Sequence, residues 1–136
     1  MRGVLVVVAA LLGRDALAAP QSYRYVARGS GSKSAVSKSC GEAAMRMRDH
    51  FESLTIDYVP GIGATVNGIP WRMMPPRFGG LVAESPLSTT KRKVQVLFEP
   101  PPHPGSVKVA IQVFEPMASG GNRCMDSELL DGRIVR

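Results

Sequence analysis

The clearest pattern in this sequence is the alternation of hydrophobic and polar residues in its second half. Residues 94–98 and 107–113 carry an apolar side chain at every second position, which is typical of strands with one buried face. A Pro-rich connection separates the two segments. We therefore expect them to form an antiparallel pair at the centre of a sheet. Less regular runs predict further strands over 22–28, 55–59 and 78–84.

A helical period replaces the alternation after residue 39. Apolar residues recur there at steps of four and three positions, so they fall on one stripe of a helix. Ser39 and Glu42 match the capping box that satisfies the first free amides of a helix. We expect this segment to be the main helix of the chain. The residues of its apolar stripe are Cys40, Ala44, Met47, Phe51 and Leu54.

Residues that turn or interrupt the chain set the remaining elements. Ten of the eleven prolines lie between Pro60 and Pro116, which excludes long helices there and leaves strands and loops. Asn67 and Gly68 predict a two-residue hairpin turn, because both central positions of that turn need a positive φ. Near the C-terminus, residues 126–130 are expected to form one helical turn.

Together these elements predict an α+β fold. We expect a single domain over residues 19–136, with an antiparallel sheet of four to six strands and one main helix packed on it. Within this domain, residues 29–39 contain five Ser, two Gly and two Lys, and no acidic residue. That composition predicts a mobile basic loop.

Residues 1–18 have the order of parts that defines an export signal. A short basic start precedes nine apolar residues, 4–12, and small residues follow at Ala16 and Ala18. Nine helical residues are too few to cross a bilayer, which needs about 20. We therefore expect residues 1–18 to be a cleaved signal peptide and the mature protein to be periplasmic or secreted, with no transmembrane segment.

Cys40 and Cys124 are the two cysteines of the chain. In an exported protein such a pair favours a structural disulfide, and intermolecular pairing or free thiols remain as alternatives. There is no C-x-x-C motif and no histidine close to either cysteine in the sequence, so neither redox chemistry nor a zinc site is indicated. We predict no metal site and no cofactor.

Basic residues outnumber acidic ones by 17 to 11, a net charge of +6. Without residues 1–18 the balance is 15 to 10, or +5, because Arg2, Arg14 and Asp15 are removed. This excess favours an acidic partner without naming one. The basic residues near the strand that starts at residue 94, with one aromatic residue, form the candidate partner-binding patch, with nucleic acid as the weaker alternative to an acidic protein. Charge at a strand end more often acts as a solvated guard against edge pairing, so that role stays open as well. The patch consists of Trp71, Arg72, Arg77, Lys91, Arg92 and Lys93.

Several short motifs are similar to those of TonB C-terminal domains. Ala43-Ala44-Met45 in the expected helix, residues 55–60 and residues 65–70 with their Asn-Gly turn resemble the second half of such a domain, and 94–98 with 119–121 resemble its first half. The resemblance implies a periplasmic binding domain of the cell envelope that contacts a protein through a sheet edge. The uncleaved anchor and long Pro-rich spacer of that family do not appear, so energy transduction is not implied.

The sequence therefore leaves three functions open. The first is an exported, non-enzymatic binding module of the bacterial cell envelope that contacts a protein partner through a sheet edge or the basic patch. The second is a small secreted ribonuclease-like hydrolase that uses His103 with a glutamate, either Glu84 or Glu99, together with nearby cations. The third is a secreted inhibitor of another protein. No catalytic residue is assigned, and no oligomeric state is indicated.

Overall fold

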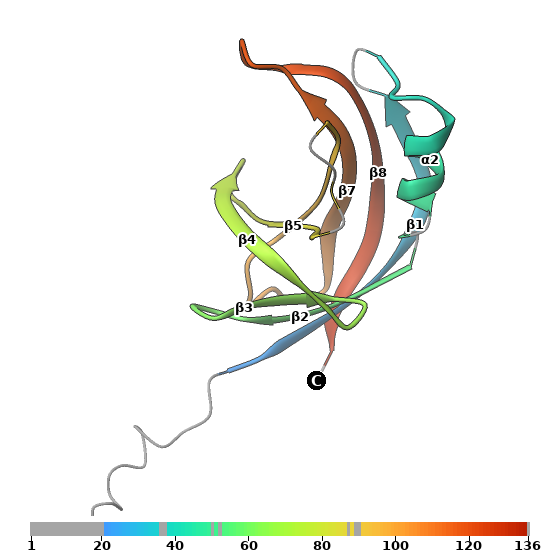
Figure 1. Cartoon of the computed structure of the whole chain (residues 1–136). Coiled ribbons are helices and arrows are strands. Elements are labelled where there is room, and N and C mark those ends of the chain that lie inside the picture. The colour runs from blue at the N-terminus through green and yellow to red at the C-terminus, as the bar shows by residue number, and fades with distance from the viewer. Residues whose placement is uncertain are drawn as a thin grey trace, which may run out of the picture.

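Eight strands form a closed antiparallel barrel, in which each strand pairs with the next and β8 pairs back with β1 (Figure 1). The computed structural model describes residues 21–35, 38–49, 51, 53–86, 88 and 91–135, so the expected signal peptide, His50 and Glu52 lie outside the described residues. The elements are β1 (Tyr23–Ala35), α2 (Glu42–Asp49), β2 (Ser53–Val59), β3 (Gly63–Val66), β4 (Ile69–Arg77), β5 (Gly80–Glu84), β6 (Lys93–Phe98), β7 (Ser106–Pro116) and β8 (Asn122–Val135).

The α+β prediction is wrong, since the described residues are dominated by strands and one short helix is the only α-helix among them. Two segments account for most of the difference. β1 continues to Ala35 through residues expected to form a basic loop, and residues 126–130 lie in β8 instead of a helical turn. These two segments pair with each other, from Ser32 with Leu129 to Ala35 with Asp126. The pairing supplies backbone hydrogen bonds to both segments. It therefore stabilises a strand conformation that their local composition does not favour.

The helix is shorter than the apolar stripe suggested. α2 ends at Asp49, and Leu54 already belongs to β2. The backbone amide of Met45 donates to the carbonyl of Gly41 at 3.0 Å, so Gly41 is the residue that directly precedes the helix and accepts its first hydrogen bond. Ser39 does not form the predicted capping box with Glu42: its hydroxyl accepts from the backbone amide of Gly41 at 3.1 Å and donates to Asp126 at 2.8 Å. The predicted pair of Glu42 and Arg46 is present, with 3.8 Å between Oε1 and Nη1.

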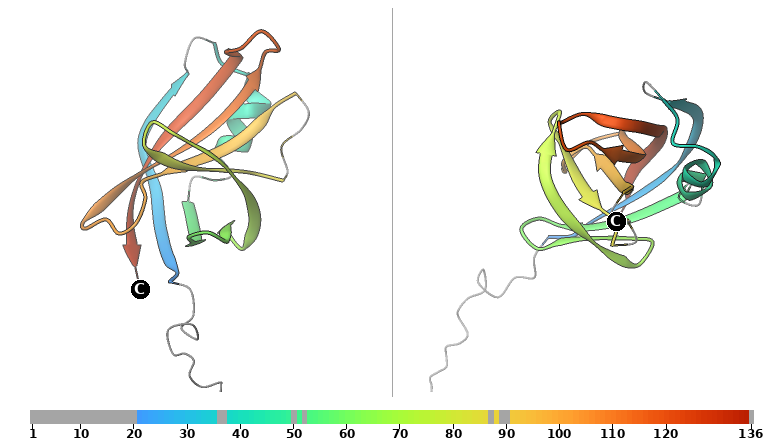
Figure 2. Two further views of the ribbon diagram at one scale, coloured as in Figure 1. Left: turned by 90° about the vertical axis from the view of Figure 1, so that its left-hand side faces the viewer. Right: turned by 45° about the horizontal axis from the view of Figure 1, so that its top comes forward.

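α2 packs against β7 and β8, and its buried Ala44 belongs to the hydrophobic core (Figure 2). Arg48 of the helix is buried, and its Nε lies 3.9 Å from Oε1 of Glu128, which is also buried. The predicted disulfide is confirmed, because Cys40 and Cys124 are bonded across a sequence separation of 84 residues. Two links therefore join this segment to β8: the disulfide at Cys40, just before the helix, and the buried ion pair between Arg48 and Glu128.

Side chains fill the inside of the barrel, as expected for a ring of eight strands. Tyr25 and Phe98 meet edge to face, with their ring centroids 5.0 Å apart, and Tyr58 contacts the same Phe98 ring. The largest apolar side chains that are completely buried include Tyr25, Phe98, Leu54, Ile56, Ile111 and Leu130. No helix within the described residues is long and apolar enough to span a membrane.

Two local predictions are confirmed. β6 and β7 are an antiparallel pair, with Val94 opposite Val113 and Phe98 opposite Val109. Asn67 and Gly68 form the two-residue turn between β3 and β4, with φ values of 50° and 83°. The other end of β4 makes a turn of the same length, which carries the candidate functional site.

Candidate protein-binding surface

Two parallel rows of side chains run across the outside of the barrel from β4 to β8. Residues that are opposite each other on neighbouring antiparallel strands share a face, so the register defines each row. The apolar row consists of Met74, Val82, Leu97, Ala110 and Leu129. The polar row consists of Arg72, Glu84, Gln95, Gln112 and Ser127.

Arg77 crosses the apolar row and reaches the polar row. It is opposite Gly80 at the end of β4, and its Nη2 donates to Oε1 of Gln95 at 2.7 Å and to Oε1 of Gln112 at 3.4 Å. Its aliphatic stem therefore runs beside Val82, which is only 1% exposed although it faces outward.

Phe78 follows Arg77 in the turn between β4 and β5. Its side chain is 97% exposed, and its backbone φ is 50°, with Gly79 next at 73°. A left-handed conformation costs an L-residue about 1–2 kcal/mol, and glycine and asparagine are the residues that usually adopt it. A bulky aromatic residue therefore occupies this position at a cost in stability, and it buries almost none of its surface.

Three of the predicted patch residues come together around the polar row. Arg72 and Lys93 both approach Oε2 of Glu84, at 3.1 and 3.8 Å. Gln95 donates from Nε2 to Oε1 of the same carboxylate at 2.9 Å and accepts the bond from Arg77 described above. The network carries three positive charges and one negative charge, so this outer face is basic.

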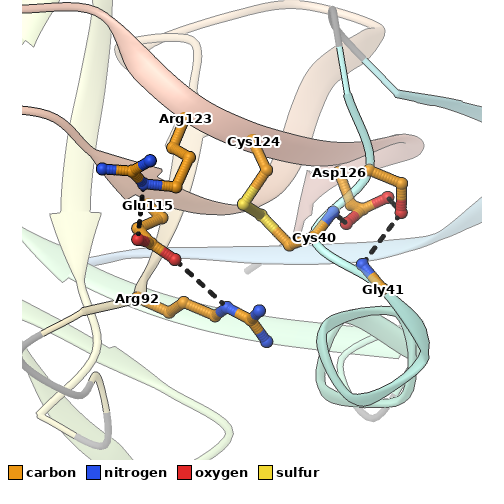
Figure 3. Close-up of a disulfide and its surroundings, with 8 residues drawn as sticks. Cys40, Gly41, Arg92, Glu115, Arg123, Cys124 and Asp126 are labelled. Carbon is orange, nitrogen blue, oxygen red and sulfur yellow. Dashed lines mark hydrogen bonds and ion pairs between the residues drawn. A yellow bond between two sulfur atoms is a disulfide. The ribbon is translucent and has the colours of Figure 1, made fainter.

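Arg92 of the predicted patch lies near the disulfide, where it shares the carboxylate of Glu115 with Arg123 (Figure 3). Nε of Arg92 lies 3.7 Å from Oε1 of Glu115, and Nε of Arg123 lies 3.0 Å from Oε2 of the same carboxylate. Lys91 precedes β6 and is exposed. The predicted patch is thus divided into a group on the outer face and a group at the end of the barrel where the disulfide lies.

Trp71 belongs to neither group. It is 4% exposed and meets Phe51 edge to face, with their ring centroids 5.4 Å apart. Its ring lies in the core, so it does not form part of the outer surface that was predicted. The alternation along β4 explains this, since Trp71 faces inward and its neighbour Arg72 faces outward.

A cavity of about 260 Å³ lies next to the Phe78 turn. Glu99 and His103 meet at its edge, with 3.5 Å between Oε2 and Nε2, and the other carboxylate oxygen of Glu99 accepts a hydrogen bond from the backbone amide of Lys108. The lining includes Arg77, Phe78, Leu97, His103, Lys108 and Leu129. No hydroxyl or thiol side chain is among the lining residues, and no cluster of His, Cys, Asp and Glu within the described part of the chain could hold a metal ion.

The sequence does not indicate Phe78, Lys108 or Leu129 as residues of a binding surface. One signal was present in the sequence: Phe78-Gly79 lies between two strand segments in the same way as Asn67-Gly68. The prediction placed Phe78 inside a strand, so its position in the turn was missed. Lys108 and Leu129 come to the cavity through the register of β6, β7 and β8, which sequence alone does not give.

No family model, curated protein or solved structure matches this chain. The similarity to TonB C-terminal domains therefore stays a prediction from short motifs. The fold that it implied differs from the closed barrel described above.

Proposed function

We propose that this protein is an exported, non-enzymatic binding module that contacts an acidic protein partner. The contact surface is the Phe78 turn together with the neighbouring cations of the outer face: Arg72, Arg77, Lys93 and Lys108. Because the barrel is closed, the proposal does not rely on the sheet edge that the sequence suggested.

One observation carries the proposal. Phe78 is 97% exposed in a backbone conformation that is unfavourable for phenylalanine. Nothing in the fold needs an aromatic side chain there, because the equivalent turn between β3 and β4 is made by Asn67 and Gly68. Residues held in unfavourable conformations concentrate at binding and active sites, and exposed aromatic residues are frequent centres of protein interfaces.

The charges around Phe78 support an acidic partner. Arg77 and Lys108 line the cavity beside the turn, and Arg72 and Lys93 lie further along the same face. The carboxylates of this surface are Glu84, Glu99 and Asp131, which is opposite Lys108 on β8, so the four cations exceed the anions. Such a surface attracts an acidic protein and increases its association rate, especially at low salt.

The test is a comparison of three immobilised proteins against the extracytoplasmic fraction of the source cells: wild type, Phe78→Asn and Ile62→Asn. Ile62 is a suitable control because it is also exposed, at 73%, in a different turn. The proposal expects one protein that is retained by the wild type and by Ile62→Asn and is lost with Phe78→Asn. Retention should also fall in about 1 M NaCl, where charges are screened beyond about 3 Å.

Retention that is equal on all three proteins would contradict the proposal. If the retained protein is an enzyme that loses activity on binding, the module acts as a secreted inhibitor, and the Phe78 turn is the segment that contacts the enzyme. This outcome would identify the kind of partner without changing the surface.

The hydrolase alternative has one specific observation in its favour. Glu99, His103, Arg77 and Lys108 line the same cavity, and they are the residue types that a metal-free ribonuclease uses. However, His103 and Glu99 are in direct contact at 3.5 Å, whereas an acid and a base that act on one phosphodiester need the substrate between them. Incubation with single-stranded RNA tests this alternative, and cleavage that is lost in His103→Ala would replace the binding proposal.

A further inference from the structure

We propose that the cavity beside Phe78 binds the C-terminal residue of the partner chain. The terminal carboxylate is recognised by Arg77 and Lys108, and an apolar side chain packs against Leu97, Ala110 and Leu129. This inference rests on the proposed function and adds the chemistry of the ligand at that surface.

Arg77 differs from several other arginines of the barrel in the partners of its charge. The arginines Arg24, Arg72 and Arg123 each approach a carboxylate closely, at 2.7, 3.1 and 3.0 Å. Arg77 has no carboxylate partner among the described residues, and its hydrogen bonds go only to the neutral side chains of Gln95 and Gln112. Its positive charge is therefore not neutralised by the protein and is available to an anion.

Hydrogen bonds hold the guanidinium of Arg77 in a fixed position. Gln95 is held by its bond to Glu84, so its carbonyl oxygen is directed to Arg77. Nη2 is occupied by the two glutamines, whereas Nη1 makes no hydrogen bond within the described part of the chain. A guanidinium that is already ordered loses little conformational entropy when it binds a carboxylate, and such charge-assisted bonds are among the strongest in proteins.

The size and the lining of the cavity fit a single terminal residue. A volume of about 260 Å³ corresponds to about nine water molecules, and it lies below the usual range for small-molecule and cofactor sites. Its walls are apolar at Leu97, Ala110 and Leu129, and cationic at Arg77 and Lys108. A single chain end fits this combination, because one terminal residue carries both a carboxylate and a side chain.

The lining contains one carboxylate, Glu99, whose charge is outnumbered by those of Arg77 and Lys108. One oxygen of Glu99 accepts the backbone amide of Lys108, and the other lies 3.5 Å from Nε2 of His103. Both oxygens are therefore engaged by protein groups. An internal acidic side chain of a partner would satisfy Arg77 but would leave the apolar wall uncovered, so the geometry favours the chain end.

The experiment uses the disulfide-bonded protein and a fluorescently labelled pentapeptide that ends in leucine. Binding is measured by fluorescence anisotropy for the peptide with a free carboxylate and for the same peptide as a C-terminal amide. We expect the amide to bind at least roughly tenfold more weakly, the difference between a charge-assisted pair and a neutral contact. A third peptide, amidated and with an internal aspartate, tests for recognition of an acidic side chain.

The matched variants are Arg77→Gln and Arg24→Gln. Arg24 is exposed and paired with Asp57, away from the cavity. Arg77→Gln is expected to weaken binding of the carboxylate peptide roughly tenfold and to leave the amide unchanged, whereas Arg24→Gln should change neither by more than about twofold. Arg77→Lys serves if Arg77→Gln does not fold, and it should also weaken binding of the carboxylate peptide, because lysine lacks the paired donors of a guanidinium.

Equal binding of acid and amide, or no effect of either Arg77 substitution, would overturn the inference. Equal binding of the internal aspartate peptide would also overturn it, because the chain end would then not be what is recognised. If none of the peptides binds while the Phe78-dependent retention of a partner persists, the inference fails and the proposed function stands.

Discussion

Asn67 and Phe78 occupy the first central position of two-residue hairpin turns at opposite ends of β4, and both have a backbone φ of 50°. Asparagine is well suited to this conformation and phenylalanine is not. The two turns therefore differ in what their first residue contributes: Asn67 favours the fold, whereas Phe78 disfavours it locally.

Replacing Phe78 with asparagine should stabilise the protein by about 1 kcal/mol, because the left-handed conformation costs phenylalanine about 1–2 kcal/mol and costs asparagine less. The reverse change, Asn67→Phe, should destabilise it by at least as much, since the hydrogen bond from the amide of Thr55 to Oδ1 of Asn67 is also lost. Urea unfolding of both variants measures the free energies. A Phe78→Asn protein that is less stable than the wild type would show that Phe78 supports the fold.

The disulfide should contribute much of the stability. It closes a loop with a sequence separation of 84 residues, for which loop-closure entropy gives about 4–5 kcal/mol. We expect the double variant Cys40→Ala with Cys124→Ala to unfold at a much lower urea concentration than the wild type. Addition of reductant should lower the midpoint of the wild type and leave the double variant unchanged, and a wild type that is insensitive to reductant would contradict this expectation.

Asp126 and the disulfide should act together. The carboxylate of Asp126 is buried and accepts hydrogen bonds from the backbone amide of Cys40 and from the hydroxyl of Ser39, both at 2.8 Å. Asp126→Ala should cost about 1–3 kcal/mol, because the amide of Cys40 is left buried without its acceptor. Without the disulfide this cost should be smaller, since the segment before α2 is then free to reach water, and a double-mutant cycle measures the coupling. Additive effects would contradict the prediction.

Tyr25 should make stability depend on pH in alkaline solution. Its burial raises the pKa of its hydroxyl above the usual value of tyrosine, and that hydroxyl donates to the carbonyl of Glu99 at 2.7 Å. In the unfolded chain tyrosine ionises near pH 10, about its reference value. Above that pH the unfolded state releases a proton that the folded state keeps, so the free energy of unfolding falls as pH rises.

Tyr25→Phe is the variant that isolates this effect. At about pH 8 it should be less stable than the wild type by about 1 kcal/mol, because one buried hydrogen bond is lost. The difference should shrink as the pH rises above about 10, since phenylalanine does not ionise. Chemical denaturation over this pH range provides the measurement, and a difference that stays constant would show that Tyr25 is not the group responsible.

Local turn chemistry and alternation predicted a large part of the strand content. The Asn67-Gly68 turn and the pairing of β6 with β7 depend on neighbouring residues or on a strict period of two, and both were predicted correctly. The fold class was not, because residues 29–35 and 126–130 have no strong strand pattern. They become strands by pairing with each other, and a contact between residues about a hundred positions apart is not encoded in either segment alone.

The candidate site also combines features that follow from the local sequence with features that follow from strand pairing. The basic residues Arg72, Arg77 and Lys93 were selected from composition, and the structure links them through Glu84 and Gln95. The partners that link them follow from the register of β4, β5 and β6, which no local pattern determines. Trp71 was selected with the same residues, but the alternation along β4 places it in the core.

The most direct test of the central claim is site-specific photocrosslinking in the source cells, with a photoreactive phenylalanine analogue at position 78 and, as the control, at position 62. Both side chains are exposed, but only the first lies at the proposed surface. The account predicts one discrete adduct from position 78, which excess wild-type protein suppresses and excess Phe78→Asn protein does not. No adduct from position 78, or the same adducts from both positions, would contradict it.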